Sequence, residues 1–499
     1  MEIEFLGATR EVTGSCFLLH VGRRRVLVEC GLIQGRSAEE ARNRDPFPFD
    51  PASIDAVVLT HAHLDHSGRL PLLYKAGYRG PIYTHRASRD LCRIMLKDAA
   101  YLNEKDVEWE NRKRQRKHLA PLEPLYTMKD AQAVMRRFRA LDYGESREVV
   151  PGVRLCLRDA GHILGSAIAE LSLEEGGVRR RLVFSGDLGH RGAPILRNPT
   201  AVAEADLVIM ESTYGNRRHR GWDETWAELE EVVTTARRGK GNILIPAFAV
   251  GRTQELLYAF GRHFEEWGLN DWTVFLDSPM AIEATEVYAR HPDLYDVEAG
   301  VFERRSGNAF MLPNLHLTRT PQQSMGINRV HDGAIIIAGS GMCNGGRIRH
   351  HFKHNIWRSD CHVLIVGFQA QGTLGRRLVD GAEEISLWGE SIRVGAKVHT
   401  IGGFSAHADC EGLFQWYQNF VDRPPVALVH GEPDSMDPFA ERLRQLPAQR
   451  VFTPERGERL DLVALRELAP PTGRGGPHRQ HEGHHKGRDH RDHRRGRRR

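Results

Sequence analysis

Four side chains that commonly bind metal ions lie within six consecutive positions of the sequence. They are His61, His63, Asp65 and His66. Neutral imidazole and carboxylate are typical ligands of zinc and similar divalent metals. The apolar run 56–59 directly before them predicts a strand. The period of two in a strand would place the first two histidines on one side, and a turn would bring the aspartate and the last histidine to a second metal. The alternative, a polar loop rich in histidine, is disfavoured by the spacing after a strand.

Three further residues could complete a site for two metals. His162 lies between two nearby glycines, which let the backbone and a metal approach closely; taken alone, it could equally be a packed core histidine. Asp187 directly follows an apolar run and could bridge two cations; taken alone, it could equally be a helix N-cap or a turn residue. His430 also follows an apolar run. The chain between Asp187 and His430 is far longer than one strand–helix unit, so we infer a domain inserted between two parts of one site.

Strand-like apolar runs that end in a polar residue alternate with helical patterns along the chain. The runs end at Glu29, Asp187, Glu211 and His430, and helical patterns cover 226–236 and 254–264. This alternation predicts an α/β fold with layered helices and sheets. Such folds usually hold their reactive residues at strand ends. The charged segment 103–118 predicts a solvated helical excursion rather than a binding face.

Composition limits the class of protein. The length of 499 residues suggests roughly two to four domains. No apolar signal core follows Met1, and no run approaches the roughly twenty apolar residues of a membrane span, so we expect a cytoplasmic protein without membrane contact. The seven cysteines are scattered and form no Cys-x-x-Cys, which indicates reduced thiols and no cysteine zinc site.

The basic excess of the chain is concentrated in its last segment. The formal net charge is +5, but the segment from 471 onward is rich in arginine and the rest is slightly acidic. Residues 470–499 are also rich in histidine and glycine and nearly free of apolar residues, so we expect a disordered tail. It would act as a polyanion-binding arm; a solubilising tail or a weak metal-binding tract are the alternatives.

With these motifs the chain resembles the metallo-β-lactamase superfamily and, within it, the β-CASP nucleases, which act on nucleic acids. The His-x-His-x-Asp-His run is shared by the whole superfamily. Glu211 looks like the acidic motif A of the β-CASP branch and His407, in 404–409, like motif B. His430 looks like motif C, where a histidine resembles the RNA-directed branch and DNA-directed members usually have valine. The segments 245–255, 277–281, 338–343 and 367–373 are similar to those of the β-CASP insert.

The resemblance implies a four-layer αββα metallo-β-lactamase fold with an inserted α/β β-CASP cap domain. We place the first part of the metallo-β-lactamase domain at 1–208, the β-CASP domain at 209–395, the second part at 396–469 and the tail at 470–499. Because the motif-bearing fold begins at Met1, we expect none of the N-terminal RNA-binding domains of archaeal forms. The sequence leaves the oligomeric state open, with a homodimer among the options.

The resemblance also assigns roles to the site residues. It implies that His61, His63 and His162 hold one zinc ion, that Asp65, His66 and His430 hold another, and that Asp187 bridges them. His407 would be the general acid and Glu211 its partner, and Asp65 would also belong to the catalytic group. These roles imply hydrolysis of single-stranded RNA by a two-metal hydroxide mechanism, within the strand, from the 5′ end, or both.

Two features bear on activity and RNA contact. The family usually has aspartate at the position of Glu29, where it supports the metal site from behind its ligands, so we expect retuned rather than lost activity. Ser340 and Gly341 lie in a turn whose backbone N–H groups could hold a phosphate, with Arg252 as a further contact; a plain tight turn is the alternative. The competing functions are a non-catalytic RNA-binding scaffold, a DNA nuclease of the same fold and a small-molecule hydrolase such as a lactonase.

Overall fold

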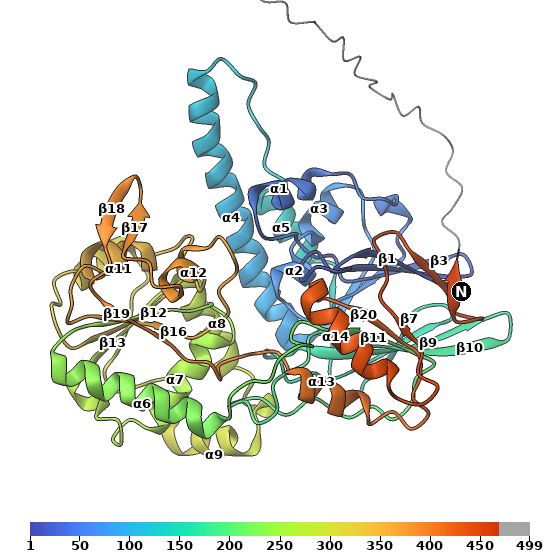
Figure 1. Ribbon diagram of the computed structural model, residues 1–499. Helices are drawn as coiled ribbons and strands as arrows, with labels where there is room; N and C mark the ends of the chain where they lie inside the picture. Colours follow the sequence, from blue (N-terminus) through green and yellow to red (C-terminus); the bar gives the residue numbers. More distant parts are fainter. Residues whose placement is uncertain (469–499) are drawn as a thin grey trace, which may run out of the picture. The chain divides into compact units, whose positions relative to one another are not determined.

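The computed structural model describes residues 1–468, and the predicted tail 470–499 lies outside the described residues. Two large sheets pack face to face, and a third sheet belongs to an inserted domain (Figure 1). Within 1–468 no helix combines the length and the apolar character that crossing a membrane requires.

The first sheet is mixed and has the strand order β23-β22-β1-β2-β3-β4-β5-β6. Its strands are β1 (Glu2–Gly7), β2 (Cys16–Val21), β3 (Arg24–Val28), β4 (Ala56–Val58), β5 (Ile82–His85), β6 (Phe138–Leu141), β22 (Arg459–Asp461) and β23 (Arg466–Leu468). Segments from both ends of the described chain therefore complete one sheet, because β22 pairs with β1.

The second sheet has the order β21-β20-β11-β10-β9-β8-β7. Its strands are β7 (Ser146–Val150), β8 (Val153–Asp159), β9 (Ala167–Glu175), β10 (Val178–Phe184), β11 (Leu207–Glu211), β20 (Val426–Val429) and β21 (Val451–Phe452). The strands β10, β11 and β20 are parallel neighbours, so their carboxyl ends lie at one edge of the sheet.

Alternation of apolar side chains builds the layers. Phe5, Phe17 and Phe184 point into the core between the two sheets, and the first two rings meet edge to face at 5.9 Å. The residues of opposite parity pack against helices on the outer faces, since side chains alternate along a strand. The helices α2 (Leu64–Ser67), α3 (Leu70–Lys75), α4 (Arg86–Arg116) and α5 (Met128–Met135) lie on the side of the first sheet, and α13 (Cys410–Tyr417) and α14 (Pro433–Arg444) cover the second. The predicted αββα layering is thereby confirmed.

Helix α4 extends well beyond the layers (Figure 1). Its outer half contains much of the segment 103–118, and Tyr101 and Trp109 there are exposed. The predicted solvated helical excursion is confirmed. A short helix, α1 (Ser37–Glu40), and the 3-10 helices η1 (Ala41–Arg44) and η2 (Pro51–Ser53) line the nearby loops.

The inserted domain contains a sheet that is parallel throughout, with the order β14-β13-β15-β12-β16-β19. Its strands are β12 (Ile243–Pro246), β13 (Thr273–Asp277), β14 (Leu315–Leu317), β15 (Ala334–Ala338), β16 (His362–Ile365) and β19 (Lys397–Thr400), with a separate hairpin of β17 (Glu384–Leu387) and β18 (Glu390–Arg393). Ile335 and Ile337 face one apolar cluster and Ile336 faces the other, so helices cover both faces.

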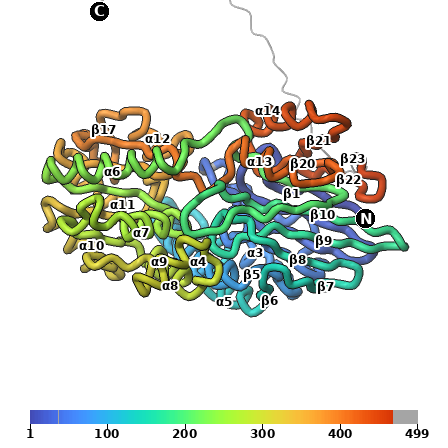
Figure 2. The backbone as a smooth tube through the Cα atoms, turned by 90° about the horizontal axis from the view of Figure 1, so that it is seen from below, coloured from blue at the N-terminus to red at the C-terminus, as the bar shows by residue number. Residues whose placement is uncertain are grey.

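Those helices form the other half of the molecule in Figure 2. They are α6 (Trp222–Gly239), α7 (Arg252–Arg262), α8 (Pro279–Ala289), α9 (Val297–Ser306), α10 (Pro321–Ile327), α11 (Ile348–Asn355) and α12 (Leu374–Val379), with the 3-10 helices η3 (Leu269–Asp271) and η4 (Pro292–Leu294). The insert is anchored to the loop between β10 and β11: Arg197 donates to the Asp293 carbonyl oxygen at 2.6 Å and Asp296 N donates to Ile195 O at 2.7 Å.

Strand pairing corrects both predicted boundaries of the insert. β11 belongs to the second sheet through pairs with β10 and β20, so the insert begins after Glu211 and not at 209. β19 pairs with β16 in the third sheet, so the insert ends after Thr400 and not at 395. β11 is a short apolar run and β19 is a short, mostly polar segment, and neither pattern indicates which sheet receives the strand.

Candidate metal centre

The histidine-rich run lies at the carboxyl end of β4, but it is not itself a strand. β4 ends at Val58, and His61 lies in the loop that follows. His63 precedes the single turn of α2, which carries Asp65 and His66. The expected strand through the first two histidines is therefore wrong. The loop and the helical turn still bring the run together, because His61 Nε2 and His63 Nδ1 lie 3.2 Å apart.

The first group of converging side chains contains His61, His63, His162 and Asp187. His162, from the loop between β8 and β9, places Nε2 3.1 Å from His63 Nδ1. Asp187, directly beyond β10, places Oδ2 3.4 Å from His61 Nε2 and 3.5 Å from His162 Nε2. Three imidazoles and one carboxylate oxygen thus face a common point.

The second group contains Asp65, His66 and His430. His430 follows β20 and places Nε2 3.2 Å from His66 Nε2 and 3.4 Å from Asp65 Oδ2. The other oxygen of Asp187, Oδ1, lies 3.3 Å from His66 Nε2. The Asp187 carboxylate therefore stands between the two groups, one oxygen toward each. All seven predicted ligand residues meet at this place.

The chemistry of this cluster fits divalent metal ions. Burial disfavours the charged imidazole and lowers the pKa of His61 to about 4 and that of His63 to about 3. Burial alone would raise the pKa of Asp187, but the surrounding imidazoles outweigh it and hold the pKa well below the usual range. Both Asp187 oxygens are buried without a hydrogen-bond partner among the described residues. Neutral nitrogen lone pairs that face one another around an unpaired carboxylate are the donor set of a metal centre.

Several ligand rings are oriented through their second nitrogen. Thr60 Oγ1 lies 3.0 Å from His61 Nδ1, the Ala406 carbonyl oxygen lies 3.0 Å from His162 Nδ1, and Thr213 Oγ1 lies 3.0 Å from His430 Nδ1. Such contacts fix the tautomer and orientation of a metal-binding imidazole. The sequence prediction missed these three residues. Only Thr60, directly before the histidine run, carried any signal.

Glu29 lies behind the ligand His66. Its Oε1 accepts a hydrogen bond from Thr60 N at 2.9 Å, and Oε2 lies 3.6 Å from His66 Nδ1, where neither of those two atoms has a hydrogen-bond partner. Glu29 adopts a left-handed backbone conformation with φ 65°. A cavity of about 20 Å³ adjoins both side chains and Ser15, and this volume is enough for one water molecule.

The predicted acid–base pair lies beside the first ligand group. His407 Nδ1 is 3.1 Å from Glu211 Oε2, and the His407 ring centroid is 4.4 Å from that of His162. Burial opposes the charged form of His407, but the Glu211 carboxylate outweighs burial and raises the pKa of His407 to about 9. Glu211 Oε1 also accepts from Leu188 N at 2.6 Å, which fixes the carboxylate. One fifth of the His407 side chain is exposed, so it borders on open space.

The three predicted RNA-contact residues lie in the insert. Ser340 Oγ accepts from Gly345 N at 3.2 Å within its own turn. Gly341 lies under the ring of Phe248, where an added Cβ would come within 2.7 Å of the ring. Arg252 is only 6% exposed, pairs with Glu255 and lies 4.9 Å from the Phe404 ring centroid. Its guanidinium therefore has internal partners.

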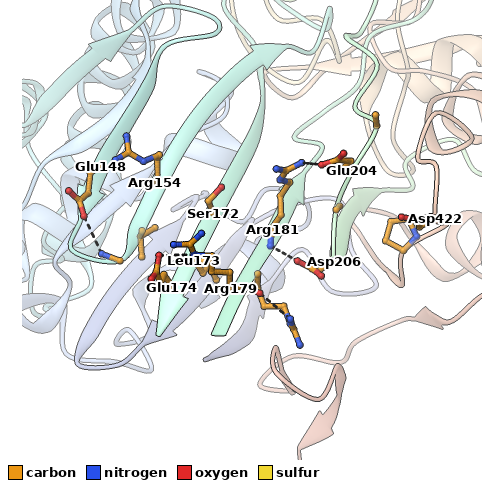
Figure 3. A pocket seen from close by; sticks show the side chains of 16 residues that line it. Glu148, Arg154, Ser172, Leu173, Glu174, Arg179, Arg181, Glu204, Asp206 and Asp422 are labelled. Atoms are coloured by element: carbon orange, nitrogen blue, oxygen red, sulfur yellow. Dashed lines mark hydrogen bonds and ion pairs between the residues drawn. The ribbon is translucent and has the colours of Figure 1, made fainter. Parts of the chain in front are cut away.

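A larger depression, of about 680 Å³, lies on the second sheet and holds none of the predicted site residues (Figure 3). Several of its charges are paired with one another: Arg181 forms an ion pair with Glu204, and Arg179 Nε lies 3.1 Å from Glu174 Oε2. The chemistry-bearing residues are thus concentrated at the metal centre and not in this depression.

Comparison with known proteins identifies the family. The Metallo-beta-lactamase superfamily model matches residues 9–234, the Beta-Casp domain matches 253–378, and the Zn-dependent metallo-hydrolase RNA specificity domain matches 391–454. The chain belongs to the metallo-β-lactamase superfamily and to its β-CASP branch.

The similarity to known proteins extends over nearly the whole chain. It is 39% identical to Ribonuclease TTHA0252 of Thermus thermophilus, over 92% of this chain and 99% of that protein. It is 32% identical to the Transcription termination factor FttA of Methanocaldococcus jannaschii, over 91% of this chain and 70% of that protein. A crystal structure of a protein of unknown function from Enterococcus faecalis V583 matches with a TM-score of 0.52 and 14% identity, covering 92% and 99% of the two chains, and supports the fold alone.

Proposed function

We propose that this protein is a zinc-dependent ribonuclease that hydrolyses phosphodiester bonds of single-stranded RNA. The observation that carries the proposal is the position of His407, paired with Glu211, directly beside a cluster of seven metal-binding side chains. A ribonuclease that is similar over 99% of its own length gives independent support. The free cysteines among residues 1–468 are compatible with action in the cytoplasm.

Two zinc ions suit the two ligand groups. His61, His63 and His162 would hold one ion, Asp65, His66 and His430 the other, and the oxygens of Asp187 would serve both. All donors are nitrogen or oxygen atoms, as in catalytic zinc sites. When bound, the ions lower the pKa of a water molecule and offset negative charge on the phosphoryl group.

His407 would donate the proton that the leaving 3′-oxygen requires. Glu211 is hydrogen-bonded to His407 Nδ1, so the proton for transfer would be the one on His407 Nε2. The carboxylate also favours the charged imidazole, which is the form that can donate. The product would carry a 5′-phosphate, whether the chain is cut within the strand or from the 5′ end.

RNA, rather than DNA, is the substrate that two observations favour. His430 occupies the motif C position, where the resembled RNA-directed branch has histidine. The RNA specificity domain matched at 391–454 contains both His407 and His430. A non-catalytic scaffold is disfavoured because the cluster holds all seven predicted ligand residues.

The test is incubation of the zinc-loaded full chain with end-labelled single-stranded RNA and DNA. Asp187→Asn, which keeps the shape of the side chain and removes its charge, is the matched control. We expect RNA to be cut by the wild type and not by the variant. Binding of RNA without cleavage would select the scaffold, and cleavage of DNA alone would select the DNA nuclease. The fragment pattern distinguishes internal cuts from 5′-terminal ones.

A further inference from the structure

A row of aromatic side chains leads outward from His407. The Tyr214 ring centroid lies 5.9 Å from that of His407, and the Phe368 ring centroid lies 6.4 Å from that of Tyr214. Tyr214 belongs to the loop after β11, where the insert begins, and Phe368 lies deeper in the insert, in the loop between β16 and α12. The row therefore leads from the proposed proton donor into the insert.

A second phenylalanine extends the row within the insert. Phe248 lies in the loop between β12 and α7. Its ring packs on the backbone at Gly341 and Gly367, where added Cβ atoms would approach the ring to 2.7 Å and 3.7 Å. β12, β15 and β16 are parallel neighbours, so the three loops leave the same edge of their sheet. The glycines make room for a ring that lies against the loops.

Both phenylalanine rings are open to solvent on their remaining surface. Phe248 is 42% exposed and Phe368 is 52% exposed. A single exposed apolar residue needs no explanation, but two on adjacent loops beside a reactive centre are unusual. Within residues 1–468, the exposed surfaces of these two rings are not packed against any other element.

A cation accompanies the rings. The Arg217 guanidinium carbon lies 4.5 Å from the Tyr214 ring centroid and 5.8 Å from that of Phe368. Arg217 is exposed, and no carboxylate within residues 1–468 forms an ion pair with it. Alternation of aromatic faces with an arginine is the arrangement with which proteins hold successive nucleotides of a single strand.

We infer that Phe248 and Phe368 form a nucleobase-stacking site, with Arg217 contacting the adjoining phosphate, that guides single-stranded RNA to the metal centre. This inference rests on the proposed ribonuclease function and specifies its substrate. Bases in a duplex already stack on one another and offer no free face, so the site selects unpaired strands. Stacking on a ring tolerates every base, so the site imposes little sequence preference.

The test measures equilibrium binding to the zinc-loaded full chain in a His407→Ala background, in which we expect turnover to be about a hundredfold slower. The probes are a fluorescent single-stranded RNA and an abasic strand of equal length, which keeps the phosphates and lacks the bases. We expect Phe368→Ala and Phe248→Ala each to weaken binding of the normal strand by about tenfold and to leave the abasic strand unaffected. Phe368→Tyr, which keeps an aromatic ring, should restore binding.

The matched control is Trp109→Ala on α4, since Trp109 is 61% exposed and lies outside the row. It should bind both strands as the parent does. Equal weakening of both strands by the phenylalanine variants, or unchanged binding of the normal strand, would overturn the inference. Absence of RNA cleavage by the wild type would instead overturn the proposed function, because base-dependent binding is measured independently of cleavage.

Discussion

Glu211 and His407 are in hydrogen-bond contact, at 3.1 Å, although a whole domain separates them in the chain. Glu211 is the last residue of β11, and His407 lies between β19 and α13. Both are therefore placed at the junction of the inserted domain with the metallo-β-lactamase layers.

His407→Ala tests the proposed proton donor. We expect loss of RNA cleavage by about two orders of magnitude or more, because the leaving oxygen loses its acid. Zinc content should stay at the wild-type level, since His407 belongs to neither ligand group. The two measurements are single-turnover cleavage and metal analysis of the same sample. Near-wild-type turnover would remove His407 from the mechanism.

Glu29→Gln tests whether the Glu29 carboxylate, which faces His66 Nδ1, strengthens metal binding. The amide can still accept from Thr60 N but loses the charge that faces His66 Nδ1. Loss of such a partner typically weakens metal binding by about tenfold or more. A competition titration with a zinc chelator measures the affinity. Glu29→Asp, which restores the residue usual in the resembled family, keeps the charge and should bind zinc more tightly than Glu29→Gln.

Removal of metal should destabilise the fold at the centre. The clustered imidazoles and the unpaired Asp187 oxygens are favourable only around cations. A ligand present at a thousand times its Kd stabilises the folded state by roughly 4 kcal/mol. Calorimetry with excess chelator should therefore show a lower Tm, restored by added zinc. Asp187→Asn should respond less to chelator; equal responses would argue against a central role of Asp187.

Gly341→Ala tests whether the position of the Phe248 ring matters for RNA binding. The new methyl would lie 2.7 Å from the ring and displace it, so we expect weaker RNA binding at unchanged zinc content. Gly345→Ala in the same loop is the control, because nothing lies within 4 Å of the added methyl. The comparison is made by titration with labelled RNA. Equal affinities of the two variants would show that the ring position does not matter.

Asp277 predicts a pH dependence of stability within the insert. Burial raises its pKa, but hydrogen bonds from His351, Ser324 and Thr318 outweigh burial and lower it from 3.8 to about 2. Because the folded-state pKa lies below the unfolded value, the carboxylate stabilises the fold above about pH 4. This contribution, roughly 2 kcal/mol, disappears as the pH falls through 2.

Asp277→Asn should therefore be less stable than wild type near pH 5 and equally stable near pH 2. Denaturant unfolding of both proteins without metal, at a series of pH values, measures the difference. A constant difference across the range would show that Asp277 does not titrate as described.

The structure brings the seven predicted ligand residues together, and several of them lie just beyond the ends of strands. The parallel strands β10, β11 and β20 end at one edge, so Asp187, Glu211 and His430 converge once the strands pair. Thr213 and the Ala406 carbonyl escaped prediction, because only the completed fold brings them to ligand rings. The strand expected through His61 and His63 failed for a local reason: a loop and one helical turn can gather the same side chains.

Predictions that depended on domain context were weaker. Short strands such as β11 and β19 do not indicate by their sequence which sheet they join, so the boundaries at 209 and 395 were misplaced. The phosphate contact predicted for Arg252 stays a prediction; in the structure its guanidinium pairs with Glu255 and lies against the Phe404 ring. Burial of a charge through a local pair cannot be foreseen from composition.

The chain leaves the metallo-β-lactamase layers after Glu211 and returns to them by way of His407, so the entry and exit of the insert meet across one hydrogen bond. Domains whose termini lie close together can be added to a host fold without stretching it. The two connections between the insert and the metallo-β-lactamase layers therefore lie close together, beside the proposed proton donor. The position of the proposed proton donor is therefore tied directly to the position of the inserted domain.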